Sequence, residues 1–116
     1  MGRAENKVAL VTGAAQGLGA AIASMLAGEG ARVMLTDINA DGAASMAASI
    51  NERQAKCAAS MHQDVTDEDR WIEVLAATVE RFGALHVLVN NAGIGSVGSI
   101  EDETLEKWRH VHAVDL

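Results

Sequence analysis

Short apolar runs alternate along the chain with longer stretches in which apolar residues recur every three or four positions. Four of these runs predict β-strands, at residues 8–11, 32–37, 55–62 and 85–90. The first and last are almost wholly apolar, which is typical of strands covered on both faces of a parallel sheet. The run at 55–62 is the least clearly patterned. The pattern therefore predicts a buried sheet built from strands separated by helices.

Three amphipathic helices are predicted between these strands. Their expected core faces are Leu18, Ala21, Ile22, Met25 and Leu26 in the first helix, Ala43, Met46, Ala47 and Ile50 in the second, and Ile72, Leu75, Ala76, Val79 and Phe82 in the third. Gly28 and Gly30 are expected to end the first helix, and Gly83 the third. Thr66 is expected to cap the third helix, whose first turn then contains acidic residues 67–69.

The alternation of strands and helices predicts an α/β protein of the Rossmann type. Each strand–helix–strand unit joins parallel strands by a right-handed crossover. We expect a three-layer α/β/α arrangement whose middle layer is a partial parallel sheet of about four strands in the order 3-2-1-4. Residues 1–116 are expected to form one partial dinucleotide-binding domain. A last helix is expected from Thr104, with Leu105, Trp108, Val111 and Asp115 along one side. The fourth strand would then be an open sheet edge.

A glycine-rich turn follows the first predicted strand. Gly13 lies where the strand must turn sharply, and Gly17 and Gly19 open the following helix. A helix N-terminus presents unpaired N–H groups and a partial positive charge, which together favour a phosphate group. Missing side chains at Gly17 and Gly19 would let a pyrophosphate approach the backbone. The alternative is a purely structural corner between strand and helix.

Asp37 ends the second predicted strand, where a dinucleotide-binding fold uses an acid to accept hydrogen bonds from the adenosine ribose. A carboxylate there would repel the 2′-phosphate of NADP, so the sequence favours NAD. Gln16 agrees with this, since a basic residue in the glycine turn would favour a phosphate. The alternative is that Asp37 only begins a turn with Asn39.

Three motifs in chain order resemble those of the short-chain dehydrogenase/reductase family. The first is T-G-x-x-x-G-x-G at residues 12–19, the second Asp64-Val65, and the third Asn90-Asn91-Ala92-Gly93 after the fourth apolar run. The resemblance implies a hydride transfer between NAD and an alcohol or ketone in the complete protein. In this family the Asp-Val pair contacts adenine, and the Asn-Asn-Ala-Gly motif steadies the sheet and lines the nicotinamide ribose. The implied cofactor-binding residues are Gly13, Ala15, Gln16, Gly17, Leu18, Gly19, Asp37, Ile38, Asp64, Val65, Asn91, Ala92 and Gly93.

No catalytic residue is assigned. The family uses a serine and a tyrosine, with a lysine four residues after the tyrosine, as its proton-transfer group, and this chain contains no tyrosine. Asp115 stands where the family places an asparagine of its catalytic tetrad. We therefore expect a fragment covering the front half of a family domain and inactive by itself. The alternative is a non-catalytic module that binds NAD or pairs with another protein.

Composition narrows the class of partner. The net charge is −7, which argues against nucleic acid and anionic membranes. The single Cys57 cannot form an internal disulfide, and a cytoplasmic location is expected. The spacing of the histidines predicts no metal site. The expected partner is a small alcohol or ketone, and the complete protein is expected to form a homo-oligomer.

Overall fold

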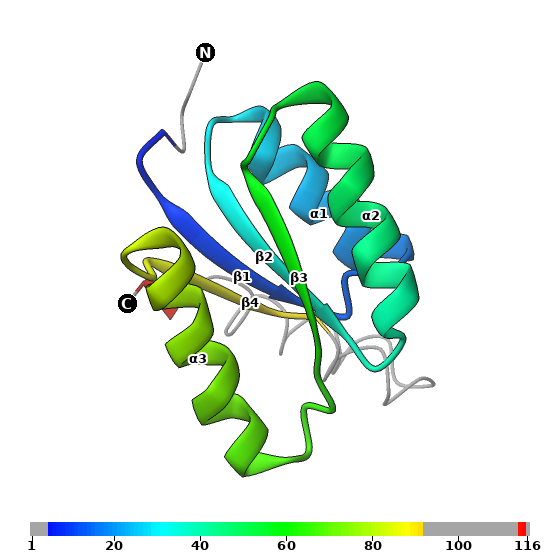
Figure 1. Ribbon diagram of the computed structural model, residues 1–116, viewed down its shortest axis with the longest axis vertical. Coiled ribbons are helices and arrows are strands. Elements are labelled where there is room, and N and C mark those ends of the chain that lie inside the picture. Colours follow the sequence, from blue (N-terminus) through cyan, green and yellow to red (C-terminus); the bar gives the residue numbers. More distant parts are fainter. Residues whose placement is uncertain (1–4, 92–113, 116) are drawn as a thin grey trace, which may run out of the picture.

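The computed structural model describes residues 5–91 and 114–115, and it contains one sheet flanked by helices (Figure 1). The elements in chain order are β1 (Val8–Thr12), α1 (Gly17–Gly28), β2 (Arg32–Asp37), α2 (Ala40–Arg53), β3 (Ala58–His62), α3 (Glu68–Phe82), β4 (Val87–Asn90) and β5 (Val114–Asp115). The four predicted strands and the three predicted helices between them are all present.

Strands β1 to β4 form a parallel sheet in the predicted order, and β5 extends it to β3-β2-β1-β4-β5. The register places Thr12 opposite Thr36 on β2 and opposite Asn90 on β4. Asp37 lies opposite His62 on β3. The carboxyl ends of the four parallel strands therefore meet at one edge of the sheet, where ligands bind in open α/β folds.

The prediction that β4 is an open edge is wrong. Asp115 pairs with Val87, and Val114 pairs with Leu88, in an antiparallel ladder. Asp115 therefore lies in a short strand rather than on the predicted last helix. A two-residue strand has too few positions to show a hydrophobic period, so the sequence pattern could not reveal it. The rest of the predicted helix, residues 104–113, lies outside the described residues.

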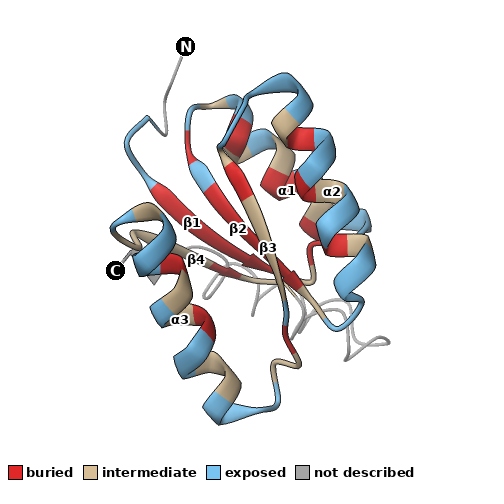
Figure 2. Cartoon of the chain, viewed as in Figure 1, coloured by how far each residue is buried: buried red, intermediate tan, exposed pale blue. Residues whose placement is uncertain are grey.

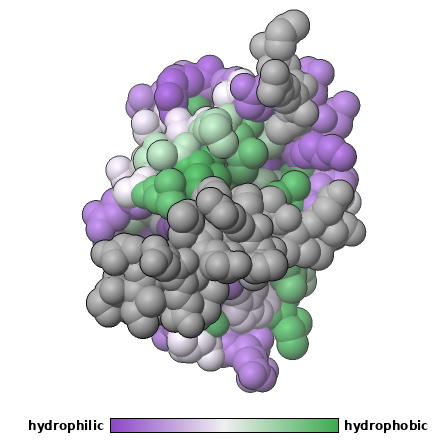
Figure 3. Space-filling model, turned by 180° about the vertical axis from the view of Figure 1, so that it is seen from behind, coloured by the Kyte–Doolittle hydropathy of each residue, from purple (hydrophilic) through white to green (hydrophobic). Residues whose placement is uncertain are grey.

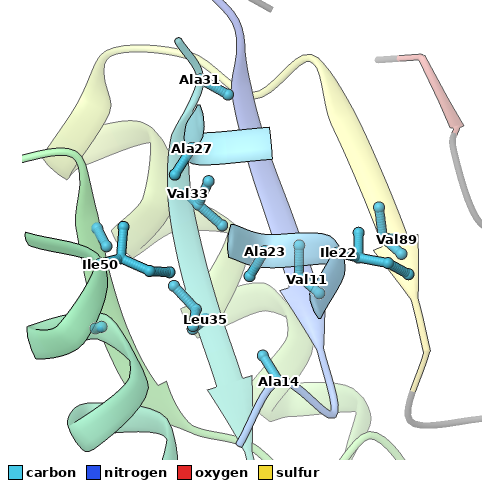
Figure 4. Close-up of a cluster of buried hydrophobic side chains, with 12 residues drawn as sticks. Val11, Ala14, Ile22, Ala23, Ala27, Ala31, Val33, Leu35, Ile50 and Val89 are labelled. Carbon is cyan, nitrogen blue, oxygen red and sulfur yellow. The ribbon is translucent and has the colours of Figure 1, made fainter. Parts of the chain in front are cut away.

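Helices cover both faces of the sheet. Helices α1 and α2 lie on one face and α3 on the other (Figure 1). The core under α1 and α2 contains Val11, Val33, Leu35 and Val89 from the strands, together with Ile22 and Ile50 from the helices (Figure 4). The core on the opposite face is built around Leu10, Met34 and Val74. The strands are accordingly the most buried part of the fold (Figure 2).

The face that each helix turns toward the sheet agrees with the prediction for α2 and in part for α1 and α3, where Ile22 is buried and Leu75 and Phe82 pack against the core. In α1 the buried residues are Gly19, Ile22, Ala23 and Ala27, whereas Leu18 and Met25 are 54% and 59% exposed. Small side chains bring α1 close to the sheet, and a pattern read from large apolar residues misses them. The face seen from behind carries apolar surface beside hydrophilic surface (Figure 3).

Helix α3 is turned by about one residue from its predicted orientation. Val74 and Thr78 are buried, whereas Ile72 and Val79 are 68% and 44% exposed. A buried threonine is tolerated here because its hydroxyl donates a hydrogen bond of 2.8 Å to the Val74 carbonyl oxygen. The capping residue is also different from the prediction. Asp67, not Thr66, caps α3 by accepting from the Arg70 N–H, and Gly83 ends the helix in the left-handed conformation as expected.

The orientation of α3 can be tested by substituting two residues that lie on opposite sides of the helix. Val74→Ala should lower the free energy of unfolding by about 2 kcal/mol, because it removes fully buried methyl groups and leaves a cavity. Ile72→Ala should change it by less than about 0.5 kcal/mol, because this side chain is exposed. Urea denaturation of both variants measures the difference. A larger loss for Ile72→Ala would contradict the observed orientation.

Candidate dinucleotide-binding site

The candidate site is built from the segments that leave the carboxyl ends of the parallel strands. Hydrogen bonds join the turn after β1 to two of these segments. One partner is Asp37 at the end of β2, and the other is Asn91 directly after β4. Asp64 and Val65 follow β3 at the same edge. Ala92 and Gly93, which were also predicted to belong to the site, lie outside the described residues.

The turn between β1 and α1 depends on three glycines. Gly13 and Gly17 have φ angles of 62° and 64°, a region that residues with side chains rarely adopt. Gly19 is required for a different reason, since a Cβ atom built on it would lie 2.0 Å from the Gly13 carbonyl oxygen. A Cβ built on Gly17 would meet nothing within 4 Å, so the backbone there borders open space. The first turn of α1 thus packs directly on the preceding turn while its outer side stays accessible.

The N-terminus of α1 differs from those of α2 and α3. Its N-cap residue, Gln16, makes no side-chain capping bond, and its first turn contains no acidic residue. In α2, by contrast, Asn39 accepts from the Gly42 N–H and Asp41 lies in the first turn. Helix α3 has the Asp67 cap and two acidic residues in its first turn. In the part of the chain that the structure describes, the first-turn N–H groups of α1 thus have no side-chain cap, which suits a helix N-terminus that binds an anion.

Asp37 connects two turns. One carboxylate oxygen accepts a bond of 3.0 Å from the Ala15 N–H, in the turn before α1. The other oxygen accepts a bond of 2.9 Å from the Asn39 N–H, in the turn before α2. The predicted alternative, a turn between Asp37 and Asn39, therefore accounts for one of the two oxygens. The carboxylate lies beside the glycine turn, as a ribose-binding acid in this fold must.

Asn90 and Asn91 tie β4 to the same turn. The Asn91 side-chain amide donates a hydrogen bond of 3.2 Å to the Gly13 carbonyl oxygen. The Thr12 hydroxyl donates to the Asn90 side-chain oxygen at 3.0 Å. The Gly13 carbonyl group is therefore held by Asn91, directly after β4, and packs closely on Gly19 of α1. This arrangement fixes the path of the turn independently of any ligand.

Asp64 and Val65 make their hydrogen bonds locally. The Asp64 carboxylate accepts from the hydroxyl and from the backbone N–H of Thr66, at 2.7 and 3.0 Å. These two bonds, the hydroxyl bond first, lower the pKa of Asp64, so this exposed carboxylate is ionised at neutral pH. The Val65 carbonyl oxygen accepts from the indole N–H of Trp71 at 2.8 Å.

Sequence reasoning missed a buried polar pair behind these residues. The Thr36 hydroxyl donates a hydrogen bond of 2.7 Å to the side-chain oxygen of Gln63. The backbone N–H of Gln63 donates a second bond, of 2.9 Å, to the backbone carbonyl oxygen of Asp37. Gln63 is 2% exposed, and its side-chain nitrogen has no partner in the part of the chain that the structure describes. In the sequence, Thr36 directly precedes Asp37 and Gln63 directly precedes Asp64. This position next to predicted site residues is the signal that could have identified the pair. Their bonds fix the distance between the ends of β2 and β3.

The described residues give little support to metal binding, membrane insertion or cysteine chemistry. Within residues 5–91 and 114–115, no three His, Cys, Asp or Glu side chains are grouped so as to hold a metal ion. No helix in these ranges is long and apolar enough to cross a membrane. Burial raises the pKa of the Cys57 thiol, which therefore remains protonated and poorly nucleophilic at neutral pH.

The close packing of α1 on the glycine turn predicts a strong contrast between two glycines of the same helix. Gly19→Ala should lower the free energy of unfolding by about 3 kcal/mol, because the new methyl group collides with backbone atoms. Gly28→Ala is the matched control, since a Cβ there meets nothing within 4 Å. It should leave stability unchanged or raise it by up to about 1 kcal/mol. Equal stabilities of the two variants in urea denaturation would contradict the observed packing.

The hydrogen bonds of Asp64 predict a pH effect with a defined sign. Because its pKa is lower in the folded state, these bonds stabilise the fold above about pH 4 and are lost as pH falls through the folded-state pKa. Thr66→Val should raise the pKa of Asp64 toward its ordinary value by removing the hydroxyl. Thr66→Ser keeps the hydroxyl and should leave the pKa low. An NMR titration of the carboxyl resonance distinguishes them, and the prediction fails if the valine variant matches the unmodified chain.

Comparison with known proteins assigns the chain to a family. The model of the short chain dehydrogenase family matches residues 7–116. Trans-4-hydroxycyclohexanecarboxylate dehydrogenase of Sinomonas cyclohexanicum is 44% identical over 119 residues, which cover 98% of this chain and 46% of that protein. The NADP-dependent (R)-specific alcohol dehydrogenase of Lentilactobacillus kefiri is 40% identical over 114 residues, covering 98% and 44%.

A solved structure agrees with these relatives. The crystal structure of a hydroxysteroid dehydrogenase from Escherichia coli superposes with a TM-score of 0.73 and 32% identity, covering 75% of this chain and 36% of that one. This chain thus spans less than half the length of the relatives described here. The matched range, the identities and the shared fold all lead to one assignment: the chain belongs to the short-chain dehydrogenase family.

Proposed function

We propose that this segment binds NAD, and that the complete protein transfers hydride between NAD(H) and an alcohol or ketone. The observation that carries the proposal is the uncapped N-terminus of α1, formed by a glycine turn beside the Asp37 carboxylate. Family membership supports it, since the relatives are dehydrogenases of small molecules. Because the chain spans less than half of these relatives, the reaction is proposed for the complete protein.

The pyrophosphate is assigned to the first turn of α1. The N–H groups of Gly17, Leu18 and Gly19 lie at a helix end whose N-cap residue, Gln16, makes no side-chain capping bond. Open space beside Gly17 gives a phosphate access to the backbone, and no acidic residue in this turn opposes its charge. The residues present therefore fit a bound pyrophosphate.

The adenosine half of the cofactor is assigned to the ends of β2 and β3. Asp37 would accept hydrogen bonds from the ribose hydroxyls. Ile38, which is 66% exposed, offers an apolar surface for the adenine ring. Asp64 is ionised at neutral pH and would accept from the adenine amino group, with Val65 beside it. The nicotinamide ribose is assigned to Asn91, Ala92 and Gly93.

The contribution of this segment to the reaction is to bind and orient. The bound nicotinamide would supply or accept the hydride. Proton transfer to or from the substrate oxygen requires an acid–base group, for which the family uses a tyrosine, and the chain contains none. We therefore assign no catalytic residue to this segment. The alternative of a non-catalytic module is not favoured, because the relatives that match the chain over nearly its whole length are dehydrogenases.

We propose NAD rather than NADP as the preferred cofactor, because the Asp37 carboxylate would face a 2′-phosphate across a short distance. Like charges in such a position cost several kcal/mol. Among the relatives, the Lentilactobacillus enzyme is named as NADP-dependent, so membership of the family does not by itself select NAD.

Fluorescence titration with NADH and NADPH tests both proposals. The unmodified chain should bind NADH saturably and at least about tenfold more tightly than NADPH. Asp37→Ala should reduce that ratio toward one, because the repulsion is removed. Gly28→Ala, remote from the site, should bind both like the unmodified chain. The absence of saturable NADH binding would refute the cofactor site, and an unchanged ratio in Asp37→Ala would refute Asp37 as its selector.

A further inference from the structure

The Asp37 carboxylate accepts a hydrogen bond from a backbone N–H group of the turn that is assigned to the phosphate. Its two oxygens accept from Ala15 and Asn39, whose N–H groups belong to different turns. The same two turns are also in contact beyond these bonds. A Cβ built on Gly42, in the first turn of α2, would lie 2.8 Å from the Ala15 Cβ. The turn that leads into α1 therefore rests against the start of α2, with Asp37 between them.

The carboxylate has enough acceptor positions to hold both turns and a ribose. An ionised carboxylate offers about four lone-pair positions. Two of them are used by the Ala15 and Asn39 N–H groups. Two remain for ribose hydroxyls, so the cofactor can bind without breaking the bond to Ala15.

The charge of Asp37 would, by itself, act against phosphate binding. A negative group beside the turn repels a pyrophosphate and weakens its binding. The hydrogen bond to Ala15 has the opposite effect, because it fixes one residue of the turn before the ligand arrives and so reduces the entropy lost on binding. These two effects predict opposite changes when the carboxylate is removed.

We propose that Asp37 is a positioning residue for the phosphate-binding turn, in addition to its proposed contact with the ribose. This inference rests on the proposed function, since it assigns the turn to a pyrophosphate. Through its bond to Ala15, Asp37 holds the turn before α1 in its binding conformation. A change of cofactor preference made by replacing Asp37 therefore loosens the turn that both dinucleotides share.

Hydrogen exchange in the ligand-free chain tests the bond directly. In Asp37→Leu, a replacement of similar shape without acceptors, the Ala15 amide should exchange at least about tenfold faster. Asp41→Leu is the matched control, because it removes the same charge from the neighbouring first turn of α2 and should leave the Ala15 amide unchanged. Asp37→Asn has one side-chain oxygen and should give an intermediate rate. Unchanged Ala15 exchange in both Asp37 variants would overturn the proposal.

Calorimetric titration with inorganic pyrophosphate, which has no ribose, provides the second measurement. If Asp37 positions the turn, pyrophosphate should bind more weakly to Asp37→Leu than to Asp41→Leu. Equal or tighter binding to Asp37→Leu would show that only charge repulsion had been removed, and would overturn the proposal. If pyrophosphate binds none of these chains, the phosphate site of the proposed function fails, while Ala15 exchange still decides whether Asp37 holds the turn.

Discussion

The first turn of α1 packs on the turn that precedes it so closely that the Gly13 carbonyl oxygen occupies the space of a Gly19 side chain. This contact fixes the position of α1 on the sheet and the direction of its N-terminus. Asn91 reinforces it from β4 by donating to the same carbonyl group. The glycine turn and Asn91, which are far apart in the sequence, thus meet at Gly13, and the rest of the candidate site is arranged around this point.

The structure leaves this one helix end without the stabilisation that the neighbouring helices receive. Side-chain caps and acidic first-turn residues are present in α2 and α3 and missing in α1. A cap contributes about 1 kcal/mol to a helix, so its absence here has a cost in stability. The uncapped N–H groups are the feature on which the proposed pyrophosphate site depends. If the site binds as proposed, the stability lost at this helix end serves binding.

Hydrogen bonds between neighbouring strand ends make the site a connected unit. Asp37 links the turns before α1 and α2, while Thr36 and Gln63 link the ends of β2 and β3. The two acids expected to recognise adenosine are therefore held in place by hydrogen bonds, Asp37 from Ala15 and Asn39 and Asp64 from Thr66. The short strand β5 pairs antiparallel with β4, so the sheet does not end at β4.

The sequence by itself determined the parallel sheet, its strand order and the family, because buried strands need continuous apolar runs and the glycine turn needs fixed spacing. It also predicted the core face of α2, since the helix's buried residues Ala43, Ala47 and Ile50 all belong to the predicted apolar stripe. In α1 and α3, two stripes compete, and only packing against the sheet decided between them. Small residues won in α1 because they permit close approach, and Thr78 is buried in α3 because its hydroxyl bonds within the helix. The partners of Asp37 and Gln63 were likewise decided by the tertiary structure, since hydrogen bonds between distant segments leave no period in the sequence.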